Sequence, residues 1–195
     1  MQLKVINVLQ LKPIKINKQQ GFTLLELIVV IIIISILGLF AIDRIWSLRM
    51  AAEQAAVTQI VGNIRSALGL EVARLALDGK ISEVAKLENS NPITLLAQAP
   101  SNYIGEKEDG DHVTEQGIWY FNKKLHTLTY TVNYTENFNT TLQGMPRIRY
   151  QIKLIYSDKN NNKRFDVNTD SIGGLDLLPL DSFSWNTNLN KIKPE

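Results

Sequence analysis

The stretch Gly21-Phe22-Thr23-Leu24-Leu25-Glu26-Leu27, which continues into the apolar run Ile28–Ile42, decides the fold of the first part of the chain. Between Phe22 and Ile42 the only ionisable side chain is that of Glu26. At 1.5 Å rise per residue, a helix over residues 22–42 is about 30 Å long, the thickness of a bilayer's hydrocarbon core. The sequence therefore predicts a membrane-spanning helix with one carboxylate near its start.

That carboxylate is unusual in such a segment. A charged side chain in hydrocarbon costs a few kcal/mol, and the residues that carry one usually serve a function. A helix that only anchors the chain has no need for Glu26. We therefore take Glu26 as a candidate functional residue.

The residues before the apolar run predict its orientation and its processing. Residues 1–21 contain four lysines and no acid, which predicts a cytoplasmic N-terminus and a C-terminal part on the other side of the membrane. An ordinary secretory signal has a small-residue cleavage site after its apolar run. This run ends in Ile42-Asp43-Arg44 without such a site, whereas the small residue Gly21 stands before the run.

These residues carry a family resemblance. Lys18-Gln19-Gln20-Gly21 followed by Phe22-Thr23-Leu24-Leu25-Glu26-Leu27 resembles the N-terminus of type IV prepilins and type II secretion pseudopilins. The resemblance implies that prepilin peptidase removes a leader after Gly21, that the new amine of Phe22 is methylated, and that Glu26 takes part in filament assembly. The partners implied are prepilin peptidase, other pilin or pseudopilin subunits, the inner-membrane assembly platform and the lipid bilayer.

Charge pairing gives this resemblance a physical basis. A carboxylate buried in hydrocarbon needs a partner, and a neighbouring subunit shifted along a filament axis offers its own Phe22 amine. Methylation of that amine retains its positive charge. Pairing between Glu26 and the neighbour's amine would then set the register between subunits.

Beyond Ile42 the apolar surface narrows to a stripe at helical spacing, which consists of Val57, Val61, Ile64, Leu68, Val72 and Leu75. No proline interrupts the chain between Phe22 and Asp78, and Gly79 is a plausible stop. We expect one long helix and four segments. These are a cytoplasmic leader (1–21), a transmembrane or filament-core helix (22–42), its amphipathic continuation (43–79) and a globular head (80–195).

The head has the alternation of β-strands. Strands are expected over Ile118–Phe121, Leu125–Tyr134 and Arg147–Tyr156, with a fourth that includes Arg164–Val167 and an apolar tail that packs on the sheet. An antiparallel sheet with one apolar face can bury that face against the amphipathic half of the helix. The expected fold class is therefore α+β and pilin-like: a long N-terminal helix packed on a C-terminal antiparallel sheet.

One loop contains residues of the kind that bind a metal. Asp158, Asn160, Asn162 and Asp166 present oxygen atoms at alternate positions followed by a later acid, an arrangement that suits calcium. Lys163 stands where the calcium-loop pattern has glycine, and Thr169 where it has glutamate. The alternative is an asparagine-rich turn between two strands. Calcium and the plain turn both remain open.

The remaining sequence argues against two classes of protein, enzymes and nucleic-acid binding proteins. The chain has no cysteine, its two histidines are isolated, and no phosphate-binding glycine loop is present, so we expect no enzyme. Without the leader lysines the charge is about −2 (17 basic against 19 acidic residues), which leaves no basic field for nucleic acid.

Two function classes remain. The first is a structural subunit of a type IV pilus or a type II secretion pseudopilus, and the absence of cysteine favours a minor subunit. It would lie in the inner membrane with a periplasmic or extracellular head and then enter the filament. The second is a membrane-tethered binding protein that never polymerises. Only the first class requires Gly21 together with Glu26.

Overall fold

The computed structural model describes residues 22–110, 113–136 and 138–186. The predicted leader, Gly21 included, lies outside the described residues. The chain divides into two compact units, Met1–Asp43 and Arg44–Glu195, which are described separately below.

The helix predicted over Phe22–Asp78 is confirmed as α1, Leu24–Leu77. It ends where the sequence predicts a stop. Gly79 adopts a φ of 70°, a conformation that is easy for glycine, and the Lys80 amide donates to the Leu75 carbonyl at 2.8 Å. This bond, from three residues beyond the helix back into its last turn, is the Schellman arrangement that satisfies terminal carbonyls.

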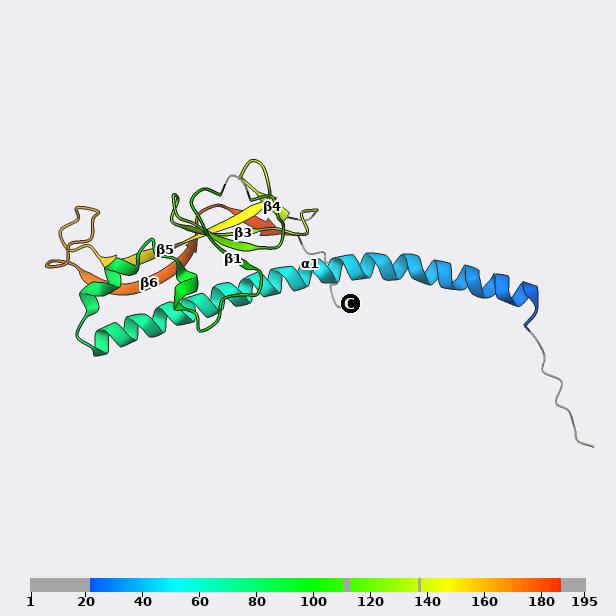
Figure 1. Cartoon of the computed structure of the whole chain (residues 1–195), viewed down its shortest axis with the longest axis horizontal. Coiled ribbons are helices and arrows are strands. Elements are labelled where there is room, and N and C mark those ends of the chain that lie inside the picture. Colours follow the sequence, from blue (N-terminus) through cyan, green and yellow to red (C-terminus); the bar gives the residue numbers. More distant parts are fainter. Residues whose placement is uncertain (1–21, 111–112, 137, 187–195) are drawn as a thin grey trace, which may run out of the picture. The chain divides into compact units, whose positions relative to one another are not determined.

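A five-stranded sheet forms the body of the second unit, in the order β1-β2-β3-β5-β6. Its strands are β1 (Tyr103–Lys107), β2 (Trp119–Asn122), β3 (Thr127–Thr131), β5 (Arg147–Ser157) and β6 (Ser171–Pro179). A separate two-stranded sheet pairs β4 (Phe138–Thr140) with β7 (Phe183–Trp185). In Figure 1 the later part of α1 lies along one face of the larger sheet.

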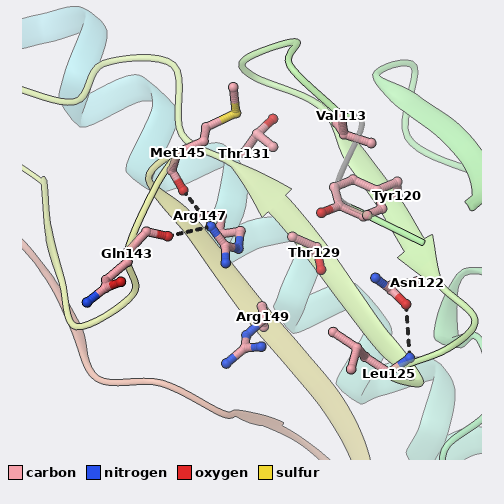
Figure 2. A pocket seen from close by; sticks show the side chains of 11 residues that line it. Val113, Tyr120, Asn122, Leu125, Thr129, Thr131, Gln143, Met145, Arg147 and Arg149 are labelled. Atoms are coloured by element: carbon pink, nitrogen blue, oxygen red, sulfur yellow. Dashed lines mark hydrogen bonds between the residues drawn. The ribbon is translucent and has the colours of Figure 1, made fainter.

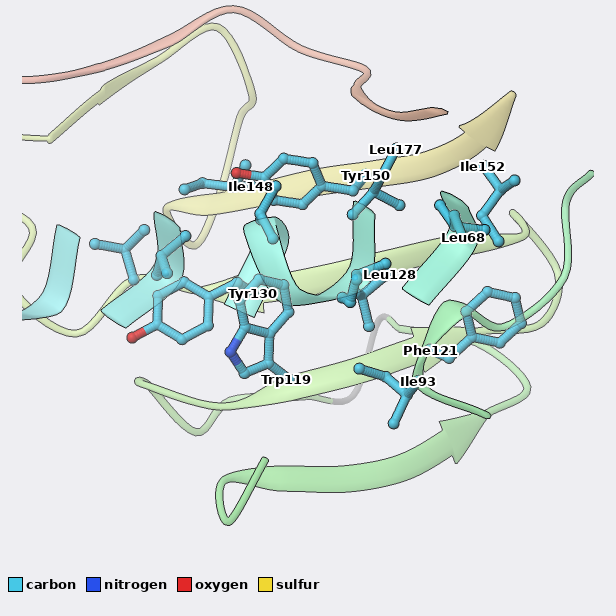
Figure 3. Packing of buried hydrophobic residues seen from close by; sticks show 14 of the residues in the cluster. Leu68, Ile93, Trp119, Phe121, Leu128, Tyr130, Ile148, Tyr150, Ile152 and Leu177 are labelled. Atoms are coloured by element: carbon cyan, nitrogen blue, oxygen red, sulfur yellow. The ribbon is translucent and has the colours of Figure 1, made fainter. Parts of the chain in front are cut away.

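The helix and the sheet bury a common core. The predicted helical stripe is confirmed, since Val57, Val61, Ile64, Leu68 and Leu75 are buried and Val72 is half-buried. From the sheet, Trp119, Leu128, Tyr130, Ile148, Tyr150, Ile152 and Leu177 pack against the stripe, most of them shown in Figure 3. Arg65 of α1 makes polar contacts with β6. Its guanidinium donates to the Leu177 carbonyl at 2.9 Å and pairs with Asp176 at 3.1 Å.

Two short 3-10 helices connect α1 to the sheet, η1 (Ile81–Leu87) and η2 (Pro92–Leu95). The first contributes Val84 to a second small core cluster with Leu75 and Leu154. The second is capped at its N-terminus, because the Asn91 side chain accepts a hydrogen bond from the Ile93 amide at 3.1 Å.

The predicted antiparallel sheet is confirmed apart from one pair of strands: β1 pairs with β2 in parallel, whereas all the other pairs of both sheets are antiparallel. A tight hairpin cannot join two parallel strands, so a longer connection separates β1 from β2.

One prediction about the sheet was wrong: the fourth strand was expected to include Arg164–Val167. That segment is a loop, and the strand is β6, which begins at Ser171. In the loop, side-chain oxygens bind the backbone: the Arg164 amide donates to Asn162 Oδ1 at 2.8 Å and the Asp166 amide to Asp170 Oδ2 at 2.9 Å. Such local bonds compete with the ladder of a sheet.

Candidate functional site

The first turn of α1 is fixed by Thr23. Its hydroxyl accepts a hydrogen bond from the Glu26 amide at 3.2 Å, so Thr23 is the N-cap of the helix. Thr23 and Glu26 have the spacing of a capping box, a signal that the sequence contained and that we had not used. The Glu26 side chain is exposed within its unit, four residues after Phe22.

The helix that follows presents apolar side chains on all sides. From Phe22 to Ile42 every residue is exposed except Gly38, which is half-buried. This segment is apolar and long enough to cross a membrane by length and composition. Its one hydroxyl outside the first turn, on Ser35, donates to the Ile31 carbonyl at 2.7 Å. That hydroxyl therefore needs no partner outside the helix, as hydrocarbon requires.

The comparisons with known proteins address this same segment. A family model described as the prokaryotic N-terminal methylation motif matches residues 16–42. The chain carries the N-terminal motif of type IV pilins and pseudopilins. The rest of the chain has no such support, since no curated protein and no solved structure matches it.

The fold agrees with the motif. A long N-terminal helix packed on a mostly antiparallel sheet is a pilin-like architecture, as the sequence predicts. The motif also supports processing by prepilin peptidase and assembly with other pilin subunits. The apolar helix fits a single-pass membrane anchor. The individual roles of Gly21, Phe22 and Glu26 stay predictions.

The second unit of this pilin-like chain contains a buried acid, Glu53, that joins the helix to the sheet. The residue is only 8% exposed, and its carboxylate accepts three hydrogen bonds. They come from the Tyr130 hydroxyl at 2.8 Å, the Asn133 amide at 2.6 Å and the Tyr134 amide at 3.0 Å. These three donors satisfy the hydrogen-bonding capacity of a carboxyl group that is removed from water.

Glu53 also affects the acidity of its partner. Burial of the phenol, followed by its hydrogen bond to the Glu53 carboxylate, raises the pKa of Tyr130 well above its usual range of about 10. Tyr130 therefore stays neutral, and its hydroxyl donates a hydrogen bond to Glu53 throughout the physiological pH range. In the sequence, Glu53 looks like an ordinary polar residue of an amphipathic helix, and only the position of the sheet reveals its role.

The four residues of the candidate calcium loop lie together. Asp158 accepts hydrogen bonds from the Asn162 amide at 3.3 Å and the Lys163 amide at 2.7 Å. The side-chain amides of Asn160 and Asn162 both donate to Asp166 Oδ2, at 2.8 and 2.6 Å. Lys163, at the position where the calcium pattern has glycine, adopts a φ of 62°. The backbone thus makes the left-handed bend for which that pattern uses glycine.

The loop includes a further acid that the sequence analysis missed. Both oxygens of Asp170 accept backbone hydrogen bonds, from Lys159 at 3.0 Å and from Asp166 at 2.9 Å. Among the described residues, however, no three acids, histidines or cysteines gather closely enough to hold a metal by themselves. Calcium would therefore need the asparagine oxygens as ligands and would compete with the hydrogen bonds of the turn.

Proposed function

We propose that the chain is a minor subunit of a type IV pilus or a type II secretion pseudopilus that assembles through its N-terminal helix. The observation that carries the proposal is the methylation motif over residues 16–42, placed on an apolar helix whose described side chains from Phe22 to Ile42 are exposed. An apolar surface of this extent must be covered by lipid or by other helices. A filament subunit uses both coverings in turn, first the membrane and then its neighbours.

In this proposal, Glu26 sets the axial position of each subunit relative to its neighbour. In the membrane its carboxylate lies near the helix N-terminus, where the helix dipole helps to stabilise it. Between packed helices the carboxylate loses water and needs a cation, and the amine of a neighbour's Phe22 supplies one. The proposal divides the chain into a removed leader (1–21), a membrane or filament-core helix (22–42), its amphipathic continuation (43–79) and a head (80–195). The head would lie in the periplasm or outside the cell.

A tethered, non-polymerising protein is the alternative. It would use residues 22–42 as a permanent anchor and would gain nothing from Glu26, since a charge only weakens insertion. It would also need no methylated N-terminus. The motif over residues 16–42 therefore favours the filament subunit.

Processing at Phe22 is the first expected consequence. Protein extracted from membranes that contain prepilin peptidase should begin at Phe22, with a methyl group on its amine. Gly21→Leu should block cleavage, because a bulky side chain replaces the small residue at the site, whereas Gln20→Ala should leave it intact. Intact-mass and N-terminal analysis distinguish these products. A wild-type chain that keeps Met1 in the presence of the peptidase would rule out the proposal.

Calcium binding in the loop Asp158–Asp170 is a second and separate proposal, supported by the convergence of the predicted residues and the bend at Lys163. For a site with the affinity of extracellular calcium modules, about 10 mM calcium is ten to a hundred times Kd. It should stabilise the fold by about 1.4–2.7 kcal/mol, which raises Tm by roughly 3–10 °C.

The control ion is magnesium, which requires a tighter octahedral arrangement and should raise Tm less. The shift with calcium should disappear in Asp158→Ala, measured on the full chain in detergent. An unchanged Tm of the wild type in calcium would show that the hydrogen bonds alone explain the loop.

A further inference from the structure

The face of the sheet that points away from α1 contains a polar cavity of about 280 Å³ (Figure 2). Its floor comes from Thr129 and Thr131 of β3, and its walls include Arg147 and Arg149 of β5 together with Gln143. Because a water molecule occupies about 30 Å³ of liquid, the cavity has room for about nine waters. A cavity of this volume can hold a monosaccharide.

The charge of the lining is positive. No aspartate or glutamate is among the described residues that line the cavity, which contains two arginines. Arg149 is neutralised by Asp181, whose carboxylate accepts two hydrogen bonds from its guanidinium at 2.7 and 2.6 Å. Arg147 has no carboxylate partner in the described part of the chain. Among the described lining residues, Arg147 is therefore the cation without a carboxylate partner.

The hydrogen bonds of Arg147 leave one edge of its guanidinium available. Nη1 donates to the carbonyls of Gln143 and Met145 at 3.1 and 3.0 Å, which fixes the orientation of the group. Nε and Nη2 have no partner among the described residues. These two nitrogens form the fork that binds a carboxylate through two parallel hydrogen bonds.

The floor contributes a buried hydroxyl with an incomplete hydrogen bond. Thr129 is 1% exposed, and its Oγ1 lies 3.4 Å from Thr127 Oγ1. This contact is longer than an ordinary O–H···O bond of about 2.5–3.0 Å. Since buried hydroxyls in proteins generally find a partner, Thr129 is poised to bond to a polar molecule in the cavity. The side chains of Asn122 and Gln143 line the same space and offer further donors and acceptors.

We propose that this cavity binds a hexuronic acid, a sugar with a single carboxylate. The carboxylate would pair with the free edge of Arg147, and the sugar hydroxyls would bond to Thr129 and to the amides of the wall. A monoanion matches the one guanidinium without a carboxylate partner among the described lining residues, whereas the dianion of a phosphate ester would leave one negative charge without a partner there. This binding does not depend on filament assembly, so either proposal can fail without the other.

The test compares three hexoses that differ in their charge at carbon 6: D-glucuronate, D-glucose and D-glucose 6-phosphate. Saturation-transfer NMR titrations on the full chain in detergent should show that glucuronate binds at least ten-fold more tightly than glucose. Glucuronate should also bind more tightly than the phosphate. Absence of glucuronate binding, or a preference for glucose or for the phosphate, would overturn the proposal.

Variants locate the binding site. Arg147→Gln should weaken glucuronate binding at least ten-fold, and Arg147→Lys should weaken it several-fold because lysine lacks the fork. Thr129→Val keeps the shape of the side chain, so it tests whether glucuronate binds in this cavity even if changes at Arg147 disturb the fold. It should weaken binding several-fold. The matched control is Arg164→Gln, which removes the same charge from an exposed loop and should leave Kd unchanged. Equal affinities in wild type, Arg147→Lys and Thr129→Val would exclude this cavity.

Discussion

Replacing Glu53 by alanine is expected to lower the free energy of unfolding by about 3–5 kcal/mol, because three donors lose their acceptor and each buried donor left unsatisfied costs about 1–3 kcal/mol. The buried Tyr130 hydroxyl and the amides of exposed Asn133 and half-buried Tyr134 would all lose their acceptor. For a chain of this size, such a loss should lower Tm by roughly 6–20 °C. Thermal unfolding of the full chain in detergent, followed by tryptophan fluorescence, measures it, because Trp119 lies fully buried in the same core.

A graded pair of variants tests the cause. Glu53→Gln keeps an acceptor oxygen but places an amide where a second acceptor is needed, so its Tm should fall between wild type and alanine. Gln59→Ala changes an exposed position on the same helix and should shift Tm by less than about 2 °C. If Glu53→Ala behaved like Gln59→Ala, the three hydrogen bonds would contribute nothing measurable to stability.

The sequence was most informative where a single local rule governs the structure. The stripe from Val57 to Leu75 predicted the buried face of α1, because helical spacing alone decides which side chains share a face. Strand β5 was equally clear, since Ile148, Tyr150, Ile152 and Leu154 alternate with polar residues and are buried as predicted. The N-terminal stretch needed only its composition and the order of its residues.

Features that depend on a tertiary partner were missed. Glu53 is a charged residue of the kind expected on a solvated helix face. It is buried because the end of β3 packs over it. The threonines of β3 are similar: alternation predicts a face open to water, yet Thr127, Thr129 and Thr131 are each 1% exposed. Strand β1 contains Gly105 and two charged residues, so its strand character comes from pairing with β2 rather than from its own propensity.

The candidate sites also divide into those that a local stretch of sequence reveals and those that form only when the chain folds. The motif around Glu26 is contiguous in sequence and could be found there, and so could Asp158, Asn160, Asn162 and Asp166. Asp170 was not singled out, because the turn brings it back to the loop only after folding. The cavity beside Arg147 combines residues from three strands and from the segments that connect strands, so no spacing in the sequence predicts it.

Neutralising Glu26 is expected to abolish docking into a filament while leaving insertion and processing intact. Glu26→Leu makes the apolar span more apolar, so the chain should still enter the membrane. Gly21 and Phe22 are unchanged, so cleavage should continue. In the filament, however, a neighbour's Phe22 amine would be buried without a partner at a cost of several kcal/mol. Since 1.4 kcal/mol corresponds to a factor of ten, the assembled fraction should fall at least ten-fold.

Three further variants separate charge from helix capping. Glu26→Gln removes the charge but keeps the size of the side chain, and it should fail as Glu26→Leu does. Thr23→Ala removes the N-cap hydroxyl that accepts from the Glu26 amide, yet leaves the carboxylate in place, so assembly should persist. Glu115→Gln, at an exposed position in the head, controls for the change in net charge.

Crosslinking between subunits tests the central claim most directly. The chain has no native cysteine, so single cysteines placed along the exposed positions of α1 report contacts between helices without interference. Wild-type, Thr23→Ala and Glu115→Gln subunits should crosslink to partner pilins through these positions, whereas Glu26→Leu and Glu26→Gln subunits should not. Equal crosslinking in all five would contradict the pairing of Glu26 with a neighbour's amine and would leave apolar packing as the basis of assembly.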